Sequence, residues 1–396
     1  MRPTAAIVAA LATALAGAFG PAASQQITVR SDSAGIEILT SDPSRSNATC
    51  VLGDEPIFRV GNDESDEATW FSQVRGVGRL SDGSVAVLDR LTAEIRIFGA
   101  DGRHLRSMGS RGEGPGEFRS AWKLWVLPGD TLWAGDYRPW RYNVFTPDGE
   151  WVRAVQLEPA YINPSRRGGV LDSGISVNTV EKRPTSRDYR VPDTVEVEVH
   201  GRDGERLTTL DRLLHSVYGP LGMYLIFTPS GVVEARGNSI ALGRTSEPQV
   251  SLLDDELRLR RIVRWSVPDR DVAAADVRAW RDDYLQGRPN SPDELSPIDD
   301  ALTRNEIPAA DVFPAFRQLM IGRDGRVWIL PYQKPREDTQ RWMGFDTDGR
   351  FLCHLDHSHG GLTAYEFGPD YWLGVHTDEL GVETVVMYEL TVPEAA

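Results

Sequence analysis

Short apolar runs separated by tight-turn signals occupy most of the chain. Val77–Leu80 is apolar and ends at Ser81-Asp82-Gly83, a sequence typical of a turn. Three more short runs follow it, at Val85–Leu88, Ile95–Phe98 and Leu105–Met108. Runs this short, with β-branched residues and turns between them, are typical of strands rather than helices. The pattern predicts a unit of four short strands.

This unit repeats. Asp89, Phe98 and Asp101-Gly102 recur 47 residues later, as Asp136, Phe145 and Asp148-Gly149. A fixed period of this size indicates an array of like units, each burying a face against the next. Four strands in roughly 40–50 residues is the size of one blade of a β-propeller.

Six such units account for most of the chain. They begin near residues 72, 118, 168, 224, 316 and 362. An N-terminal arm, residues 25–61, precedes them. It contains Gly35–Leu39, which alternates like a strand, and Ile57–Val60, which resembles a fourth strand without its first three. Because an open sheet edge invites aggregation, we expect this strand to pair with the last unit and close the ring. The fold class expected is all-β: one six-bladed β-propeller over residues 25–396.

Residues 268–314 break the pattern. Asp271–Gln286 carries apolar residues at helical spacing, and Ile298–Asn305 suits a second short helix after a proline-rich stretch. The segment is too small to hold a core of its own. It is therefore expected to be a short helical insertion between blades four and five.

Residues 1–24 have the pattern of a signal peptide. Arg2 precedes the apolar run Ala5–Gly20, and Ala22-Ala23-Ser24 offers small residues for cleavage. No other stretch is long and apolar enough to cross a bilayer, so the mature chain is expected to have no transmembrane segment and to be secreted or periplasmic. The net charge of −15 argues against a nucleic-acid partner, which needs a basic face. In an oxidising compartment Cys50 and Cys353 could form a disulfide, or remain two buried thiols.

The blade motif resembles that of NHL-like and TolB-like six-bladed propellers. It reads Val87-Leu88-Asp89, then Ile95-Arg96-Ile97-Phe98, then Asp101-Gly102, although Leu91-Thr92-Ala93 lacks the Asn usual in NHL repeats. The chain also resembles a family of secreted bacterial six-bladed propellers. The motifs that carry this second resemblance are Ser33-Ala34-Gly35-Ile36, Gly112–Phe118, Pro314-Ala315-Phe316 and Asp378–Glu383. The resemblance implies the fold and no particular reaction.

Candidate chemistry is sparse. The sequence has no nucleophile elbow, P-loop, HExxH or CxxC motif. Asp89 and Asp136 each end a second strand, where they could ligate a metal near the channel or accept N–H bonds from the following turn. His357 and His359 belong to the densest cluster of ligand-type residues, which could hold zinc or form a solvated loop. No cofactor is therefore expected, with calcium or zinc left open.

Long loops point to one end of the propeller as a binding face. The Asp-Gly turns share one end of the blades, and every long connection, including the helical insertion, falls at the other. Candidate ligand-binding residues at the long-loop end are Lys182, Arg183, Arg187, Arg190, Arg138 and Trp140. We expect a non-catalytic protein that binds a protein, peptide or glycan there, with the insertion as a partial cover. The alternative is a metal-dependent, lactonase-like hydrolase with a site at the channel mouth.

Overall fold

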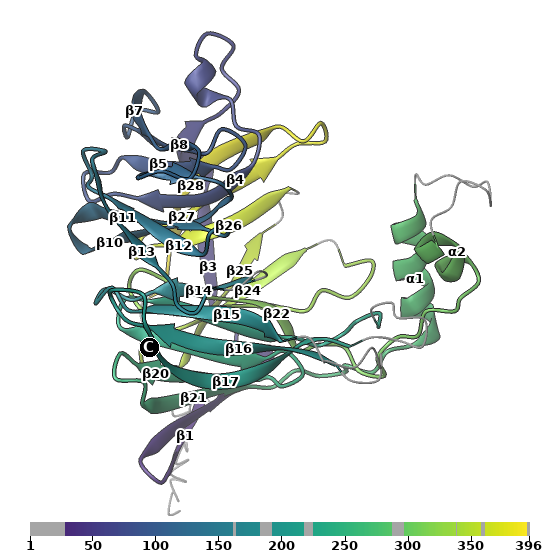
Figure 1. Cartoon of the computed structure of the whole chain (residues 1–396). Helices are drawn as coiled ribbons and strands as arrows, with labels where there is room; N and C mark the ends of the chain where they lie inside the picture. Colours follow the sequence, from purple (N-terminus) through teal and green to yellow (C-terminus); the bar gives the residue numbers. More distant parts are fainter. Residues whose placement is uncertain are drawn as a thin grey trace, which may run out of the picture.

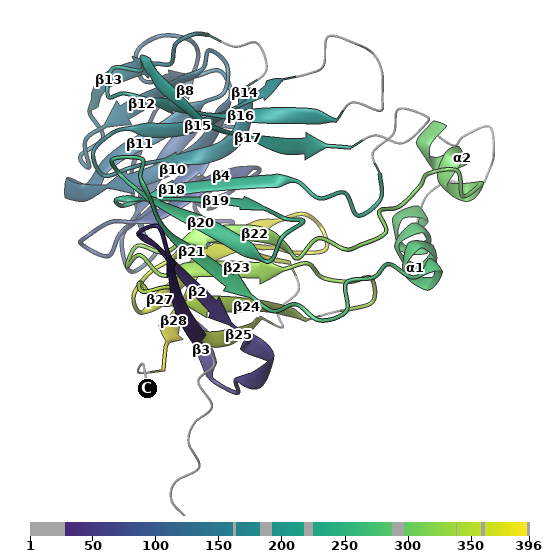
Figure 2. The ribbon, with the colours of Figure 1, turned by 90° about the horizontal axis from the view of Figure 1, so that it is seen from below.

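The computed structural model describes residues 28–160, 164–182, 192–217, 225–286, 297–337, 339–357 and 361–393. The predicted signal peptide, 1–24, lies outside these residues. Antiparallel β-sheets dominate the molecule, and the two α-helices stand apart from them on one side (Figures 1 and 2).

The first repeat forms a four-stranded antiparallel sheet in which neighbours in sequence pair. Its strands are β4 (Val74–Arg79), β5 (Val85–Asp89), β6 (Glu94–Phe98) and β7 (His104–Met108). The final turn holds Gly102 at a φ of 81°, a conformation that glycine adopts without steric cost, and its N–H donates to the Gly99 carbonyl at 2.8 Å. The strand boundaries therefore match the sequence prediction to within a few residues.

The next two repeats build sheets of the same order. One contains β10 (Ala121–Leu127), β11 (Thr131–Asp136), β12 (Arg141–Phe145) and β13 (Trp151–Gln156). The other contains β14 (Pro164–Val170), β15 (Ser176–Lys182), β16 (Asp193–His200) and β17 (Arg206–Ser216). The short strands β8 (Ser110–Arg111) and β9 (Glu117–Phe118) pair in the connector between the first two sheets. Single 3-10 turns occur at Pro43–Arg45, Glu67–Thr69 and Pro128–Asp130.

The N-terminal arm extends the fourth sheet. This sheet contains β18 (Gly231–Arg236), β19 (Ser239–Arg244), β20 (Gln249–Asp254) and β21 (Leu259–Trp265). The arm adds β2 (Ile36–Ser41), parallel to β21, and then β1 (Thr28–Ser33) as the edge strand. The sequence analysis predicted the strand at β2 but not its pairing with β21.

The last two repeats share an eight-stranded sheet through the arm. Its strands, in spatial order, are β22 (Phe316–Ile321), β23 (Val327–Pro331), β24 (Gln340–Phe345), β25 (Phe351–His357), β3 (Thr49–Val60), β28 (Glu383–Thr391), β27 (Tyr371–Thr377) and β26 (Leu362–Phe367). Most of β3 pairs antiparallel with β28, as Val60 does with Val385, while Cys50 pairs with Leu355 in parallel β25. The arm strand thus pairs with the C-terminal repeat, as its sequence suggested.

The first strand of each repeat is its innermost strand, and it contacts the innermost strands of two other repeats. These contacts run from β4 to β10, β14, β18, β22, β26 and back to β4. Apolar side chains fill the spaces between sheets, as where Phe118 contacts Phe145 and Trp265 contacts Phe316. Repeated four-stranded meanders packed face to face are the architecture of a β-propeller. The innermost strands therefore surround a common centre.

Two helices lie between β21 and β22. They are α1 (Ala274–Leu285) and α2 (Pro297–Thr303), close to the ranges expected from helical spacing. They form a satellite cluster with Phe227, whose ring lies 4.7 Å from that of Phe313 and 6.3 Å from that of Trp280. The helices are anchored to neighbouring connections instead of standing alone.

Candidate functional site

A cavity of about 410 Å³ opens among the innermost strands. All six of β4, β10, β14, β18, β22 and β26 contribute to its wall. The charged and aromatic lining residues are Arg75, Trp122, Lys123, Glu234, Arg317 and Tyr365. Arg75 and Trp122 lie at the second positions of their strands, so the cavity is at the end where innermost strands begin. Connections from one sheet to the next enter at that end, which is the end that the sequence analysis favoured for binding.

Lys123 is held across the cavity wall. Its Nζ donates to the Gly168 carbonyl oxygen at 2.9 Å and lies 3.1 Å from Oε2 of Glu234. The ammonium also lies 5.1 Å from the centroid of the Trp125 ring, within the range of a cation–π contact. Lys123 thereby links β10 to β14 and β18, and Glu234 is already neutralised by it.

Arg75 and Tyr365 meet at the backbone of Val74. Arg75 Nη1 and the Tyr365 hydroxyl each donate to the Val74 carbonyl at 2.9 Å, and the Arg75 guanidinium lies 5.8 Å from the Trp122 ring centroid. Burial is the main cause that raises the pKa of Tyr365 to about 12. Glu383 accepts the Val74 N–H at 2.6 Å, and burial raises the pKa of its carboxyl although the charge of Arg75 acts in the opposite direction.

Arg317 differs from these two cations. It follows Phe316 in β22, and its side chain is exposed. Within the described part of the chain, no residue forms a hydrogen bond or an ion pair with its guanidinium. Arg317 therefore keeps its planar set of donors available on the cavity wall.

A buried ionic network crosses the centre at the other end of the innermost strands. Glu366, in β26, is 1% exposed and accepts hydrogen bonds from Arg236 at 3.0 Å and from the Tyr371 hydroxyl at 2.7 Å. Arg323 lies 3.6 Å from the same carboxylate and donates to the carbonyls of Arg79 and Val126. The network joins β4, β10, β18 and β26 at their C-terminal ends, opposite the cavity.

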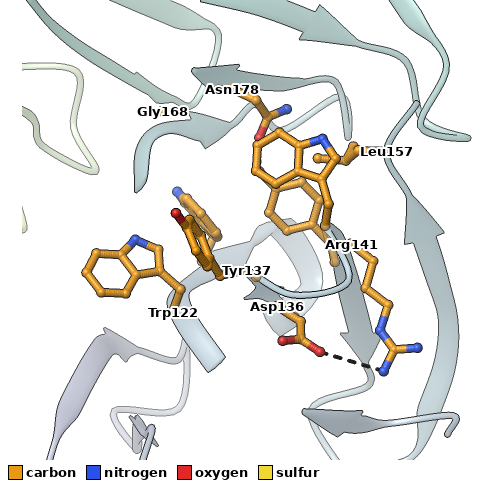
Figure 3. A pocket seen from close by; sticks show the side chains of 11 residues that line it. Trp122, Asp136, Tyr137, Arg141, Leu157, Gly168 and Asn178 are labelled. Carbon is orange, nitrogen blue, oxygen red and sulfur yellow. Dashed lines mark hydrogen bonds and ion pairs between the residues drawn. The ribbon is translucent and has the colours of Figure 1, made fainter. Parts of the chain in front are cut away.

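A small aromatic pocket adjoins the cavity in the second sheet (Figure 3). Its volume is about 30 Å³, and its walls include Trp122, Trp125, Tyr137, Trp140 and Leu157. The cavity and this aromatic pocket share Trp122 and Gly168 as lining residues. The aromatic pocket and the cavity therefore adjoin at these two residues.

Asp136 lies at the edge of the aromatic pocket. It accepts the backbone N–H groups of Arg119 at 3.1 Å and Ser120 at 2.7 Å, and Arg141 lies 3.7 Å away, as the dashed line in Figure 3 shows. Burial raises its pKa despite these partners. Asp89 is held similarly, accepting the N–H groups of Ser72 at 2.9 Å and Leu91 at 2.7 Å. Both carboxylates therefore accept backbone N–H bonds. Leu91 belongs to the turn that follows Asp89, as considered from sequence, whereas Arg119 and Ser120 lie before the first strand of the repeat that contains Asp136.

The remaining candidates from sequence are only partly described. Trp140 is 7% exposed in the wall of the aromatic pocket, and Arg138 is exposed. Lys182 ends β15 and His357 ends β25, but their side chains, like Arg183, Arg187, Arg190 and His359, lie outside the described residues. Across the ranges that the structure describes, no three His, Cys, Asp or Glu side chains gather as a metal site.

The sequence analysis missed the residues of the cavity. Arg75, Lys123, Glu234, Arg317 and Tyr365 come from five different repeats, so no local motif contains them. Their common signal is a polar or aromatic residue near the start of a repeat's first strand. Aligning the repeats on that strand would have brought them together.

We expected the helical insertion to cover the binding face in part. Among the described residues, the insertion does not line the cavity. None of the lining residues that the structure describes falls within residues 268–314. Figures 1 and 2 show α1 and α2 standing away from the sheets.

No helix in the described ranges is both long and apolar enough to cross a membrane.

Solved structures share the fold at low sequence identity. A Bacteroides fragilis protein, whose name only proposes that it is exported, has 10% identity and a TM-score of 0.50, covering 90% of this chain and 99% of its own. A DUF4221 family member from Bacteroides vulgatus has 10% identity and a TM-score of 0.47, covering 88% and 100%. Regucalcin from Agrobacterium tumefaciens, described as calcium-binding, has 11% identity and a TM-score of 0.41, covering 87% and 97%. The last two are too distant to support an argument. No protein-family model and no curated protein matches the chain.

Proposed function

We propose that the chain is an exported six-bladed β-propeller of the NHL-like and TolB-like kind that binds a ligand, without catalysis, at the mouth of its central channel. The cavity of about 410 Å³ among the six innermost strands is the observation that carries this proposal. Such a volume suits a small ligand or the tip of a larger protein, peptide or glycan. The buried Glu366 network crosses the far end of the centre, which supports entry of a ligand from the long-loop end.

Export is supported by two independent features of the chain. Residues 1–24 have the pattern of a signal peptide, and Cys50 and Cys353 are joined in a disulfide, a bond that persists mainly in oxidising compartments. The Bacteroides fragilis protein that shares the fold carries a name suggesting export. Fractionation of expressing cells should find the processed chain outside the cytoplasm, starting near Gln25.

The metal-dependent hydrolase is the weaker candidate. A bound calcium ion needs about six to eight oxygen ligands, and catalytic zinc needs three protein ligands. Among the described residues, the cavity offers one carboxylate, Glu234, which Lys123 already neutralises, and the positive charges of Arg75 and Arg317 would repel a divalent ion. These residues do not fit a metal. Elemental analysis of protein purified without chelator should find no stoichiometric calcium or zinc, and one tightly held ion per chain would favour the hydrolase.

A matched pair of tryptophan substitutions tests the binding site. Ala364 lines the cavity, whereas Ala100 lies exposed beside an Asp-Gly turn at the opposite end. A panel of peptides and envelope oligosaccharides would be screened by thermal shift. A ligand that stabilises the wild type should lose its effect with Ala364→Trp and keep it with Ala100→Trp. The reverse pattern would place binding at the tight-turn end and refute the site.

A further inference from the structure

We propose that the ligand is an acidic saccharide, with its oxyanion held by Arg317 and Arg75 and a sugar ring lying on Trp122. This inference rests on the proposed binding function and names the chemistry of the same site. It begins with charge. The chain carries a net charge of −15, yet the described lining of the cavity has Arg75, Lys123 and Arg317 against the one carboxylate of Glu234. A concave site of one sign focuses its field and attracts the opposite charge.

The three cations are not equivalent, and the difference selects an anchor. Lys123 is engaged with Glu234 and Gly168, and Arg75 uses Nη1 on the Val74 carbonyl. Arg317 is exposed in the cavity and has no ion-pair partner within the described residues. A guanidinium with a free fork matches the two oxygens of a carboxylate or a sulfate. Arg317 is therefore the primary anchor, with Arg75 adding charge from β4, which is separated from β22 by β26 around the cavity.

The rest of the wall suits a sugar better than a bare anion. Trp122 is half-buried and lines both cavities, and the Arg75 guanidinium lies 5.8 Å from its ring centroid, so aromatic surface adjoins the cations. Gln318 and Thr363 add hydrogen-bonding groups to the wall, which hydroxyl groups of a sugar could use. The adjoining aromatic pocket, about 30 Å³, has room for a methyl-sized substituent. A volume of about 410 Å³ for the main cavity accommodates more than a lone carboxylate or sulfate ion.

Calorimetric titration with three probes separates saccharide recognition from simple anion binding. The probes are di-galacturonate, its neutral methyl ester, and sodium sulfate, all at one ionic strength because surface electrostatics depend on salt. The wild type should bind di-galacturonate at least about tenfold more tightly than the ester, since a hydrogen bond to a charged group is worth about 1.5–3 kcal/mol. Sulfate should bind more weakly than the disaccharide.

Three variants identify the groups responsible. Arg317→Gln should weaken di-galacturonate at least about tenfold and leave the ester unchanged. Glu234→Gln should strengthen binding of di-galacturonate severalfold because it removes the one carboxylate among the described lining residues. Structural damage alone would not produce such an increase. Arg59→Gln, an exposed arginine on β3 away from the cavity, is the matched control and should change nothing.

The outcomes distinguish this inference from the proposed function. Suppose that Ala364→Trp blocks binding of a neutral ligand and that Arg317→Gln does not change the affinity for it. The proposed binding site would then be supported, and the inference of an acidic saccharide would be wrong. Sulfate that binds as tightly as di-galacturonate would overturn the saccharide assignment. If neither the acid nor sulfate binds at about 1 mM, the inference fails outright.

Discussion

Glu366 is a buried carboxylate whose charge is balanced by two arginines, so neutralising it should reduce the stability of the fold. Its carboxylate is 1% exposed and faces Arg236 at 3.0 Å and Arg323 at 3.6 Å. Removing one partner of a buried ionic group leaves the other charges uncompensated, at a cost of about 3–5 kcal/mol. Glu366→Gln should therefore lower the free energy of unfolding by about that amount in a urea titration.

An exposed ion pair provides the control for Glu366. Arg341 and Asp356 are joined at 2.5 Å and 2.9 Å, but their side chains are 58% and 44% exposed. Because water screens such a pair, Asp356→Asn should cost less than about 1 kcal/mol. Equal losses in the two variants would show that the Glu366 network contributes no more than a surface pair.

Tyr365, in the cavity wall, should make the free energy of unfolding depend on pH in the alkaline range. Burial raises the pKa of its hydroxyl from the ordinary 10 to about 12. The neutral form is thus favoured by folding, so this residue leaves stability unchanged below pH 10 and lowers it as pH rises from 10 toward 12. Tyr365→Phe should make the fall in unfolding free energy across this window shallower. Burial also raises the pKa of Tyr142 and Tyr371, so some slope should remain. An unchanged slope would contradict the assignment.

At the scale of residues, the sequence predicts contacts between residues that are close along the chain. It does not predict contacts that depend on how distant repeats pack together. The N–H bonds of Leu91 to Asp89 follow from a carboxylate at a strand end, because the partner is two residues away. Lys123 and Glu234 are 111 residues apart, and only the arrangement of sheets brings them together. The cavity could not be read from any one repeat.

The strand β3 is the element on which closure depends. It pairs with β28 from Val51 to Val60 and with β25 at Thr49 and Cys50, so two sheets would lose a neighbour without it. Protein lacking residues 28–61 should aggregate, since unpaired backbone groups on β25 and β28 would be open to other chains. Size-exclusion chromatography and light scattering would measure this.

Two controls separate strand loss from other effects of the truncation. Removing only residues 28–35 deletes β1 and its turn but keeps β3, so this protein should stay soluble and elute like the full chain. Cys50→Ala in the full chain removes the disulfide without removing the strand. A truncated chain that stays soluble and melts like the Cys50→Ala protein would show that β3 is dispensable.

At the scale of elements, the periodicity of apolar runs predicts where strands and helices occur better than it predicts which elements they pair or pack with. The strand at β2 is evident in the sequence, whereas its parallel pairing with β21 depends on where the arm crosses the molecule. The helices α1 and α2 follow from helical spacing, but their anchor, Phe227, belongs to a different connection. Alternation fixes which face of an element is apolar, and tertiary packing decides what that face meets.

The whole molecule is organised by the 47-residue repeat and by the way its ends meet. The repeat predicts like units, and the contacts of innermost strands from β4 around to β26 and back are what a closed array requires. Cys50 and Cys353 lie at the seam between the last two repeats, where β3 runs beside β25. Hydrogen bonds and a covalent bond therefore secure the same junction.

The disulfide should stabilise this junction mainly through the unfolded chain. It links residues 303 apart, and both cysteines are buried. In the loop-entropy model a cross-link of this span stabilises the folded state by about 5 kcal/mol. Reduced wild type and the Cys50→Ala/Cys353→Ala double variant should both unfold at markedly lower temperature than the oxidised protein, and reduction should not affect the double variant further. Two free thiols in denatured, unreduced protein from the periplasm would contradict the bond. If the bond is present but its reduction leaves the melting temperature unchanged, then β3 pairing alone holds the seam, and the covalent link is not what stabilises the ring.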